Sequence, residues 1–177
     1  MSRLFFALLP DDNTRQALQQ ISTALPLSSR QRTPAENWHI TLAFIGHVKE
    51  ELVPKIIDIT MPVRMPTITL VFDQLDYWRK AGVLCLTCSQ PALAAVNLVT
   101  HLSTLLAALD LKLDTRPYCP HLTLARHIRE QPTAVFKPII WDANQFALME
   151  SISSPAGVVY QPLQFWQLVQ PLPNQAE

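Results

Sequence analysis

Two short segments of the sequence carry residues that could do acid–base chemistry on a phosphate group. One reads His39-Ile40-Thr41-Leu42-Ala43, and the other, 82 residues later, reads His121-Leu122-Thr123-Leu124-Ala125. Five histidines in this composition should give only about 0.4 His-x-Thr matches by chance. Because the two segments also share Leu and Ala, duplication explains the pair better than accident does.

The spacing within each segment places its histidine and threonine together. Alternate residues of a strand share a face, about 6.6 Å apart, so an imidazole and a hydroxyl can converge on one tetrahedral group. Histidine, with an ordinary pKa near 6.5, can be neutral in one copy and protonated in another near pH 7. Two such strands across a cleft would supply a general base and a general acid, each contributing about 10² to 10⁴ in rate. The threonine hydroxyls could donate to phosphoryl oxygens in the transition state.

Structural explanations of the same residues remain open. A single His-x-Thr segment is more often a polar exposed face or a hydrogen-bonded core histidine, and only the matched pair favours a function. Zinc is a rival, but His47, His101 and His127 supply no close ligand spacing, so we interpret them as surface or packing residues. Cys85 and Cys88 lie in an apolar run without a second Cys pair, which indicates structural cysteines rather than a zinc or redox site.

Composition excludes several classes of protein. The 177 residues suit one compact domain, and 14 basic against 14 acidic side chains provide no basic face for a long nucleic acid. Three scattered glycines cannot form a P-loop or a dinucleotide fingerprint. The opening apolar run 4–9 stops at Pro10 and favours a buried strand over a signal peptide. No membrane span and no oligomerisation repeat are visible, so we expect a cytoplasmic monomer.

Hydrophobic periodicity and turn residues predict an α+β fold with mostly antiparallel sheet. Each half of the chain places a helix before a strand that carries a histidine. A polar loop is expected at 28–37 and a polar turn at 76–80, and the tail 171–177 is expected to be loose. The strands are expected at 3–9, 38–45, 67–72, 82–88, 121–125, 145–151 and 157–168. One helix is expected directly after the capping residues at 10–13, and two more are expected at 50–59 and 91–109.

In these contexts the two segments resemble the motifs of the 2H phosphoesterase family, and most closely its bacterial RNA 2′,3′-cyclic phosphodiesterase branch, also called 2′-5′ RNA ligases. The likeness covers residues 3–168 and includes Arg3-Leu4-Phe5-Phe6-Ala7, Glu150-Ser151 and Tyr160. The resemblance implies one domain, 1–170, made of two pseudo-twofold-related lobes. Each lobe would be an antiparallel sheet with helices on its outside, and the two would flank a central cleft.

The resemblance also implies an activity and roles for the residues. The enzyme would hydrolyse 2′,3′-cyclic phosphate ends to 2′-phosphates without metal or cofactor, and the reverse reaction would make a 2′-5′ linkage. His39 is similar to the family's proton donor and His121 to its proton acceptor, with Thr41 and Thr123 holding the phosphate and Arg126 binding substrate. The sequence alone does not decide which histidine is the acid. Strand alternation would also turn Arg126 away from His121 and Thr123 unless the strand ends or twists there.

Other functions fit the same motifs. The substrate could be another cyclic nucleotide, such as ADP-ribose cyclic phosphate, rather than a nucleoside 2′,3′-cyclic phosphate or an RNA end. The protein could also bind RNA ends without turning them over. Tyr77, Trp78 and Tyr118 are the candidates for stacking on the nucleoside, although each could equally be an ordinary packing residue.

Overall fold

The computed structural model describes residues 1–111, 113, 116–155 and 157–169, and it has the α+β fold that the sequence predicts. The predicted loose tail, 171–177, lies outside the described residues. The helices are α1 (Asp12–Ala24), α2 (Leu52–Thr60) and α3 (Leu93–Ala107), with a 3₁₀ turn, η1 (Ala35–Asn37). The strands are β1 (Ser2–Leu8), β2 (Ile40–Val48), β3 (Ile68–Phe72), β4 (Gln74–Trp78), β5 (Val83–Thr87), β6 (His121–Arg126), β7 (Ile139–Ala143), β8 (Gln145–Ser154) and β9 (Gly157–Gln167).

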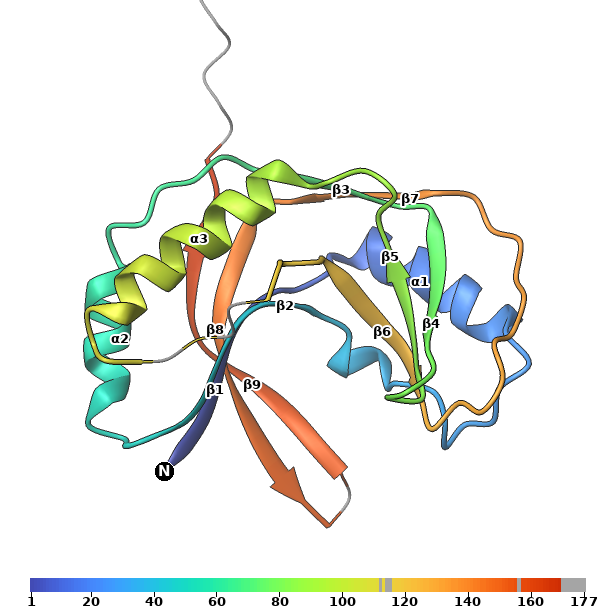
Figure 1. The fold of residues 1–177 in the computed structure, drawn as a ribbon, viewed down its shortest axis with the longest axis horizontal. Helices are drawn as coiled ribbons and strands as arrows, with labels where there is room; N and C mark the ends of the chain where they lie inside the picture. The colour runs from blue at the N-terminus through green and yellow to red at the C-terminus, as the bar shows by residue number, and fades with distance from the viewer. Residues whose placement is uncertain (112, 114–115, 156, 170–177) are drawn as a thin grey trace, which may run out of the picture.

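The strands form one sheet in the order β4-β5-β6-β2-β1-β8-β9 and a separate ribbon of β3 and β7. Neighbouring strands in both are antiparallel. Figure 1 places α2 and α3 in the half of the molecule that holds β1, β2, β8 and β9, and α1 in the half that holds β4, β5 and β6, where it contacts β7. The two lobes therefore share one continuous sheet, whose halves join where β2 pairs with β6.

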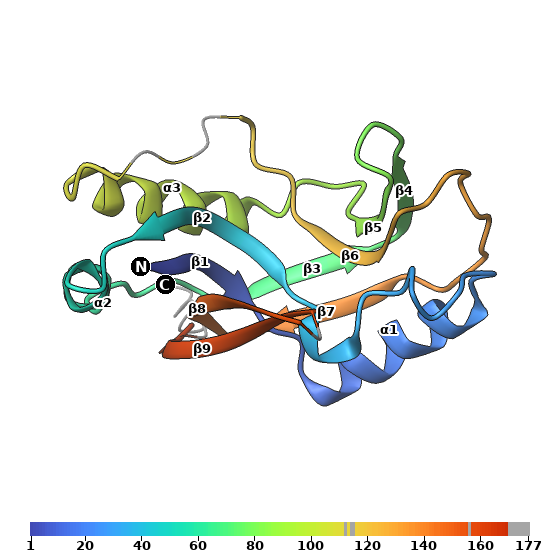
Figure 2. The same cartoon turned by 90° about the horizontal axis from the view of Figure 1, so that it is seen from below.

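The join between the lobes is narrow, because the register of β2 on β6 is a single residue pair, Ile40 with Leu122. Both side chains are fully buried in the main core. Figure 2, which views the molecule from below, shows β2 and β6 meeting between the two lobes. The two predicted motif strands are therefore direct neighbours rather than walls on opposite sides of an open gap.

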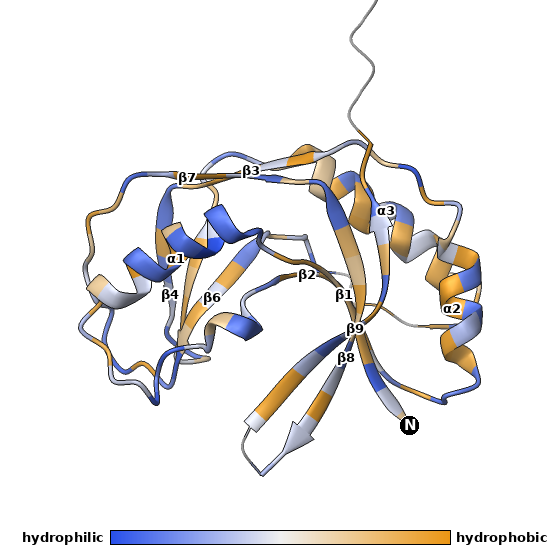
Figure 3. Ribbon diagram, turned by 180° about the vertical axis from the view of Figure 1, so that it is seen from behind, coloured by the Kyte–Doolittle hydropathy of each residue, from blue (hydrophilic) through white to orange (hydrophobic). Residues whose placement is uncertain are grey.

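The first strand pairs with β2 and β8 along its two edges, and it is also buried on both faces. Leu4 and Phe6 point into the main core, whereas Phe5 and Ala7 form a smaller apolar cluster with Met149 and Ala147 on the other face. The sequence reflects this double burial as an unbroken apolar run rather than an alternation. Helix α1 instead covers the core with one stripe and, as Figure 3 shows, presents mostly hydrophilic residues outward. Asp11 caps this helix by accepting a 2.7 Å hydrogen bond from the Thr14 amide.

The structure corrects three expectations about the elements. The polar turn predicted at 76–80 begins only at residue 79: β4 extends to Trp78, and Asp76 is a strand residue whose carboxylate accepts a hydrogen bond from Thr87. β2 does not end at Gly46, which adopts a φ of +84° beside a bulge and lets the strand continue to Val48. β7 was not predicted, because its short apolar run follows the proline-rich stretch before it.

The described part of the chain contains no helix that is both long enough and apolar enough to span a bilayer.

The Ile40–Leu122 contact makes a prediction about stability. Replacing the fully buried Ile40 with alanine leaves a cavity at the join of the lobes and should lower the free energy of unfolding by about 2–5 kcal/mol. Urea denaturation followed by tryptophan fluorescence measures this change. Ile140→Ala is the control, since Ile140 is 66% exposed and its loss should change the free energy by less than about 0.5 kcal/mol. Equal losses in the two variants would contradict the importance of the join.

Candidate active site

The pairing of Ile40 with Leu122 brings the two predicted motifs together. Because the strands are antiparallel, extending this register by one residue in each direction places His39 opposite Thr123 and Thr41 opposite His121. The side chains of Ile40 and Leu122 point into the core, so the four flanking side chains share the opposite face. A local twofold axis through the Ile40–Leu122 pair therefore relates the two His-x-Thr segments.

Each motif strand contains a β-bulge at the same position. In β2 the register skips Leu42 between Thr41 and Ala43, and in β6 it skips Leu124 between Thr123 and Ala125. An extra residue in the strand reverses the alternation of every side chain that follows. Arg126, which strict alternation would turn away, is therefore returned to the face of His121 and Thr123. The bulge in β6 therefore explains how Arg126 can share a face with His121 and Thr123.

The same bulge in β2 exposes an aromatic residue that sequence reasoning missed. Phe44 occupies the position after the first motif that Arg126 occupies after the second, and it is 45% exposed although it is a large apolar side chain. The guanidinium of Arg3 lies 5.1 Å from the centre of its ring. The sequence could have pointed to Phe44, because Phe44 follows His39 at the same spacing as Arg126 follows His121.

The ring of His39 is held in one orientation and one tautomer. Its Nδ1 lies 2.7 Å from the carbonyl oxygen of Asn37, which can only accept, so Nδ1 carries the proton. In the neutral ring Nε2 then accepts from the Thr41 hydroxyl, 3.2 Å away. The rings of Phe5 and Tyr160 pack against the imidazole with centroid distances of 5.0 Å and 4.8 Å.

The carbonyl that fixes His39 is itself anchored by neighbouring structure. Asn37 ends the 3₁₀ turn η1, where its amide donates to the Pro34 carbonyl. Its side-chain Nδ2 donates a 2.9 Å hydrogen bond to the carbonyl of Val158 in β9. η1 lies within the loop predicted at 28–37, so part of that loop is an ordered support for the histidine.

His121 is held in the same way from the other motif. Its Nδ1 lies 2.9 Å from the carbonyl oxygen of Cys119, again the residue two positions earlier, so Nε2 is free of the proton in the neutral ring. The ring packs against Trp78, with centroids 4.6 Å apart. Trp78 was predicted as a residue that stacks on the nucleoside, and the structure places it against the histidine.

Burial and a nearby cation disfavour the protonated form of both rings. Burial lowers the pKa of His39 from its ordinary 6.5, and the charges of Arg126 and His121 lower it further, against the Asn37 hydrogen bond that raises it. Burial also lowers the pKa of His121, with a further lowering by Arg126, against the hydrogen bond to Cys119. Both imidazoles are therefore mostly neutral at pH 7 in the free protein.

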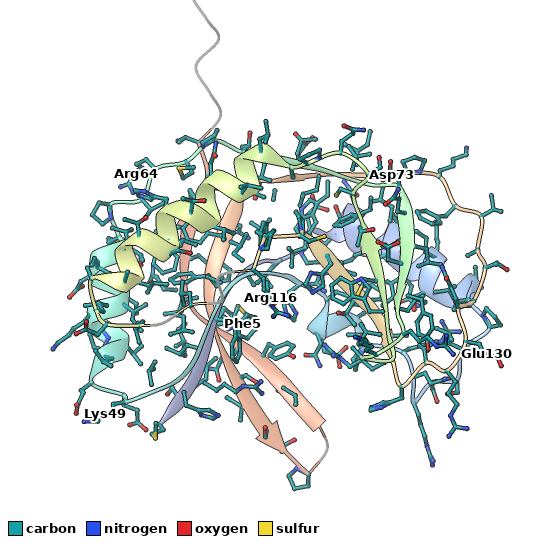
Figure 4. The ribbon with its side chains drawn as sticks, in the orientation of Figure 1. Phe5, Lys49, Arg64, Asp73, Arg116 and Glu130 are labelled. Carbon is teal, nitrogen blue, oxygen red and sulfur yellow. The ribbon has the colours of Figure 1, made fainter. Side chains whose placement is uncertain are left out.

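Two adjoining cavities open beside the histidines. The larger, about 450 Å³, is lined by His121 with aromatic and apolar side chains that include Phe44, Trp78 and Tyr118. The smaller, about 110 Å³, is lined by His39 and Arg126. Thr41 and Phe44 line both cavities, so the two meet beside the first motif. Figure 4 shows Phe5 and Arg116, one from the lining of each cavity, in the middle of the molecule between the lobes.

The other residues that were predicted for the site lie in different surroundings. Thr123 lies 3.9 Å from the thiol of Cys85, its cross-strand neighbour on β5, and it lines neither cavity. Tyr77 donates to the carbonyl of Ile128 and lines neither cavity, which argues against it as a stacking residue. A third groove of about 620 Å³, larger than either cavity, runs between α1 and β7, and no predicted site residue lines it.

The three cysteines are free thiols, as the interpretation of Cys85 and Cys88 as structural requires. Burial raises the pKa of Cys85 to about 11, which keeps its thiol protonated and unreactive. Within the described residues no three His, Cys, Asp or Glu side chains gather where they could hold a metal ion.

Comparison with known proteins agrees with the geometry. The RNA 2′,3′-cyclic phosphodiesterase of Escherichia coli strain K12 is 30% identical over 171 residues, which are 95% of this chain and 97% of that protein. The family model described as LigT like Phosphoesterase matches residues 8–85, which contain the first motif. The chain belongs to the 2H phosphoesterase family.

Other members of the family support this assignment over the whole chain. The RNA 2′,3′-cyclic phosphodiesterase of Methanocaldococcus jannaschii is 24% identical and aligns with 93% of this 2H phosphoesterase and 99% of its own length. The crystal structure of E. coli LigT complexed with 3′-AMP superimposes with a TM-score of 0.83 at 28% identity, covering 96% of this chain and 99% of that one. The expected resemblance to the family is thus confirmed on sequence and on fold.

The position of Arg126 makes a prediction about the histidines. Arg126→Gln removes the cation that lowers the pKa of both rings, so both pKa values should rise toward 6.5. Titration of the ring ¹⁵N resonances by NMR measures both shifts. A fall in either active-site pKa would contradict the placement of Arg126 on this face.

Proposed function

We propose that this protein hydrolyses 2′,3′-cyclic phosphate groups to 2′-phosphates, using its own histidines as acid and base. The observation that carries the proposal is the antiparallel Ile40–Leu122 pair, which sets two imidazoles and two threonines on one face beside two adjoining cavities. The curated relatives named RNA 2′,3′-cyclic phosphodiesterase support the same chemistry.

The proton transfers follow from the tautomers of the rings. Because a backbone carbonyl holds each Nδ1 proton, only Nε2 of each ring exchanges a proton with the substrate. Nε2 of neutral His121 takes a proton from water as the water oxygen bonds to phosphorus. Nε2 of protonated His39 gives its proton to the 3′ oxygen as the P–O3′ bond breaks, which leaves the phosphate on O2′. The assignment of donor and acceptor is the one that the family resemblance implies.

The charge of the phosphate makes the required protonation possible. Both histidines are mostly neutral in the free protein, but an anionic ligand beside them favours the protonated form of one. Arg126 and the hydroxyls of Thr41 and Thr123 then donate to the phosphoryl oxygens as negative charge increases in the transition state. Arg126 also prevents both rings from being protonated at once.

The larger cavity is the site we propose for the nucleoside. Its volume of about 450 Å³ lies within the range of about 300–1,000 Å³ typical of small-ligand sites, and Phe44 and Tyr118 offer ring faces to a base. The solved complex of E. coli LigT with 3′-AMP supports a nucleotide in this fold. We propose nucleoside 2′,3′-cyclic phosphates and RNA ends as substrates, not long duplexes, and a cytoplasmic monomer as the form that acts on them.

The activity is tested with 2′,3′-cyclic AMP in the presence of EDTA. The unmodified protein should release 2′-AMP, identified by chromatography against 3′-AMP. His39→Ala and His121→Ala should each lower kcat by about 10² to 10⁴, the usual contribution of a general acid or base. His101→Ala, which removes an exposed histidine on α3, is the control and should leave kcat unchanged.

Each other outcome identifies a different function. Tight binding of the cyclic nucleotide without turnover would indicate that the protein binds RNA ends and does not hydrolyse them. Loss of turnover in EDTA would indicate a metal-dependent reaction. Turnover that survives either histidine substitution would contradict the proposed acid–base mechanism.

The pH dependence of kcat/KM follows from the lowered pKa values. The competent free enzyme has one imidazole protonated and one neutral, and this form is most abundant between the two pKa values. Because both lie below 6.5, kcat/KM for 2′,3′-cyclic AMP should be bell-shaped with its maximum on the acid side of 6.5. In Arg126→Gln the maximum should move to higher pH. A profile that is flat from pH 5 to 9 would contradict two working imidazoles.

A further inference from the structure

One wall of the small cavity takes no part in the proposed mechanism. It is formed by Arg3, Ser151 and Tyr160, and it adjoins His39, whose ring packs against Tyr160. They come from three adjacent strands, since β1 pairs Leu4 with Glu150 of β8, and β8 pairs Ser151 with Tyr160 of β9. Their side chains therefore lie side by side on one face of the sheet.

The side chains lining this cavity that can carry a charge near neutral pH are all basic. Arg3 and Arg126 both line it, together with His39, and no carboxylate does. Among the described residues neither arginine forms one of the ion pairs of the protein, which join Met1 to Glu50 and Lys49 to Glu51. Two guanidinium groups in a carboxylate-free cavity favour an anion.

The two arginines differ in their relation to the imidazoles. Arg126 lowers the pKa of both histidines, so its charge is close to the reacting phosphate. Arg3 is not a cause of either shift, and its guanidinium lies over the ring of Phe44. Arg3 is therefore placed for a group of the substrate beyond the reacting phosphorus.

A buried hydroxyl on the same wall also lacks a partner. Ser151 Oγ has no exposed surface and no hydrogen-bond partner within the described part of the molecule. Leaving a buried hydroxyl unsatisfied costs about 1–3 kcal/mol, so a ligand that accepted a hydrogen bond from it would recover that cost. In this cavity an anion oxygen can serve as acceptor for Ser151 and for Arg3 together.

The volume limits what this wall can bind. About 110 Å³ is well below the range of about 300–1,000 Å³ for whole ligands, yet it exceeds the share of a few water molecules, about 30 Å³ each. A phosphate group fits this volume and a nucleoside does not.

We propose that Arg3 and Ser151, with Tyr160 beside them, form a second anion subsite that binds a phosphate of the substrate other than the cyclic one. The proposal rests on the proposed function, since the cyclic phosphate is taken to lie between the histidines. The chemistry it selects is a nucleotide that carries a 5′-phosphate or a 5′-phosphodiester in addition to its 2′,3′-cyclic phosphate. The preferred substrate is then the end of an RNA strand rather than an isolated cyclic mononucleotide.

The test compares two substrates that differ only at the 5′ position. Adenosine 2′,3′-cyclic phosphate carries a 5′-hydroxyl, and its 5′-phosphorylated form carries the second anion. The unmodified protein should have a kcat/KM about tenfold higher for the phosphorylated form, the size expected of one charge-assisted hydrogen bond in a partly exposed site. Arg3→Gln should abolish this preference while leaving kcat/KM for the 5′-hydroxyl substrate within about twofold.

Two further variants separate charge from structure. Arg3→Lys keeps the cation and should retain most of the preference. Arg64→Gln removes an arginine that lies away from the cleft, at the α2 end of the molecule in Figure 4, and should leave the preference unchanged. If Arg3 only supports Phe44, Arg3→Gln would lower turnover of both substrates equally, and that result would overturn the subsite.

The two substrates distinguish a failure of the proposed subsite from a failure of the proposed function. Turnover of the 5′-hydroxyl substrate without any gain from the 5′-phosphate would overturn the subsite and leave the function intact. Absence of turnover with both substrates would overturn the function itself.

Discussion

The structure depends on one contact, the antiparallel pairing of Ile40 with Leu122. This pair joins the two halves of the sheet, and its buried side chains force the neighbouring histidines and threonines onto the opposite face. A shift of one residue in this register would bury these histidines and threonines and expose the apolar residues. The pairing that holds the lobes together is thus the same pairing that assembles the site, so stability and chemistry cannot be separated at this point.

Symmetry gives the site its pair of imidazoles, and departures from symmetry give the two rings different surroundings. Both rings use the same anchor, an Nδ1 hydrogen bond to the carbonyl two residues earlier. His39 contacts two aromatic rings and is hydrogen-bonded to Thr41, whereas His121 contacts Trp78 and borders the larger cavity. After the bulges, one motif presents Phe44 and the other Arg126. A reaction that needs one acid and one base requires this kind of difference.

Much of the fold and most of the site could be predicted from local patterns. The two His-x-Thr segments, the cap at Asp11 and the apolar stripes of the helices are signals within a few residues of each other, and the structure bears them out. β4 and β7 could not be predicted in this way. Their residues are half polar or follow prolines, and they are strands because each pairs along its length with a buried neighbour, β5 or β3.

The sequence by itself determined which groups can do chemistry, because residue type and the period of two along a strand set what His39, Thr41, His121 and Thr123 can share. Only the tertiary structure decided where Arg126, Phe44 and Arg3 point. Two bulges reverse the alternation in β2 and β6, and a bulge depends on the register against a distant partner strand. The neighbours of Arg3 likewise come from β8 and β9, more than 140 residues along the chain. Backbone hydrogen bonds between remote segments carry no local sequence signal, which is why these positions follow from the fold alone.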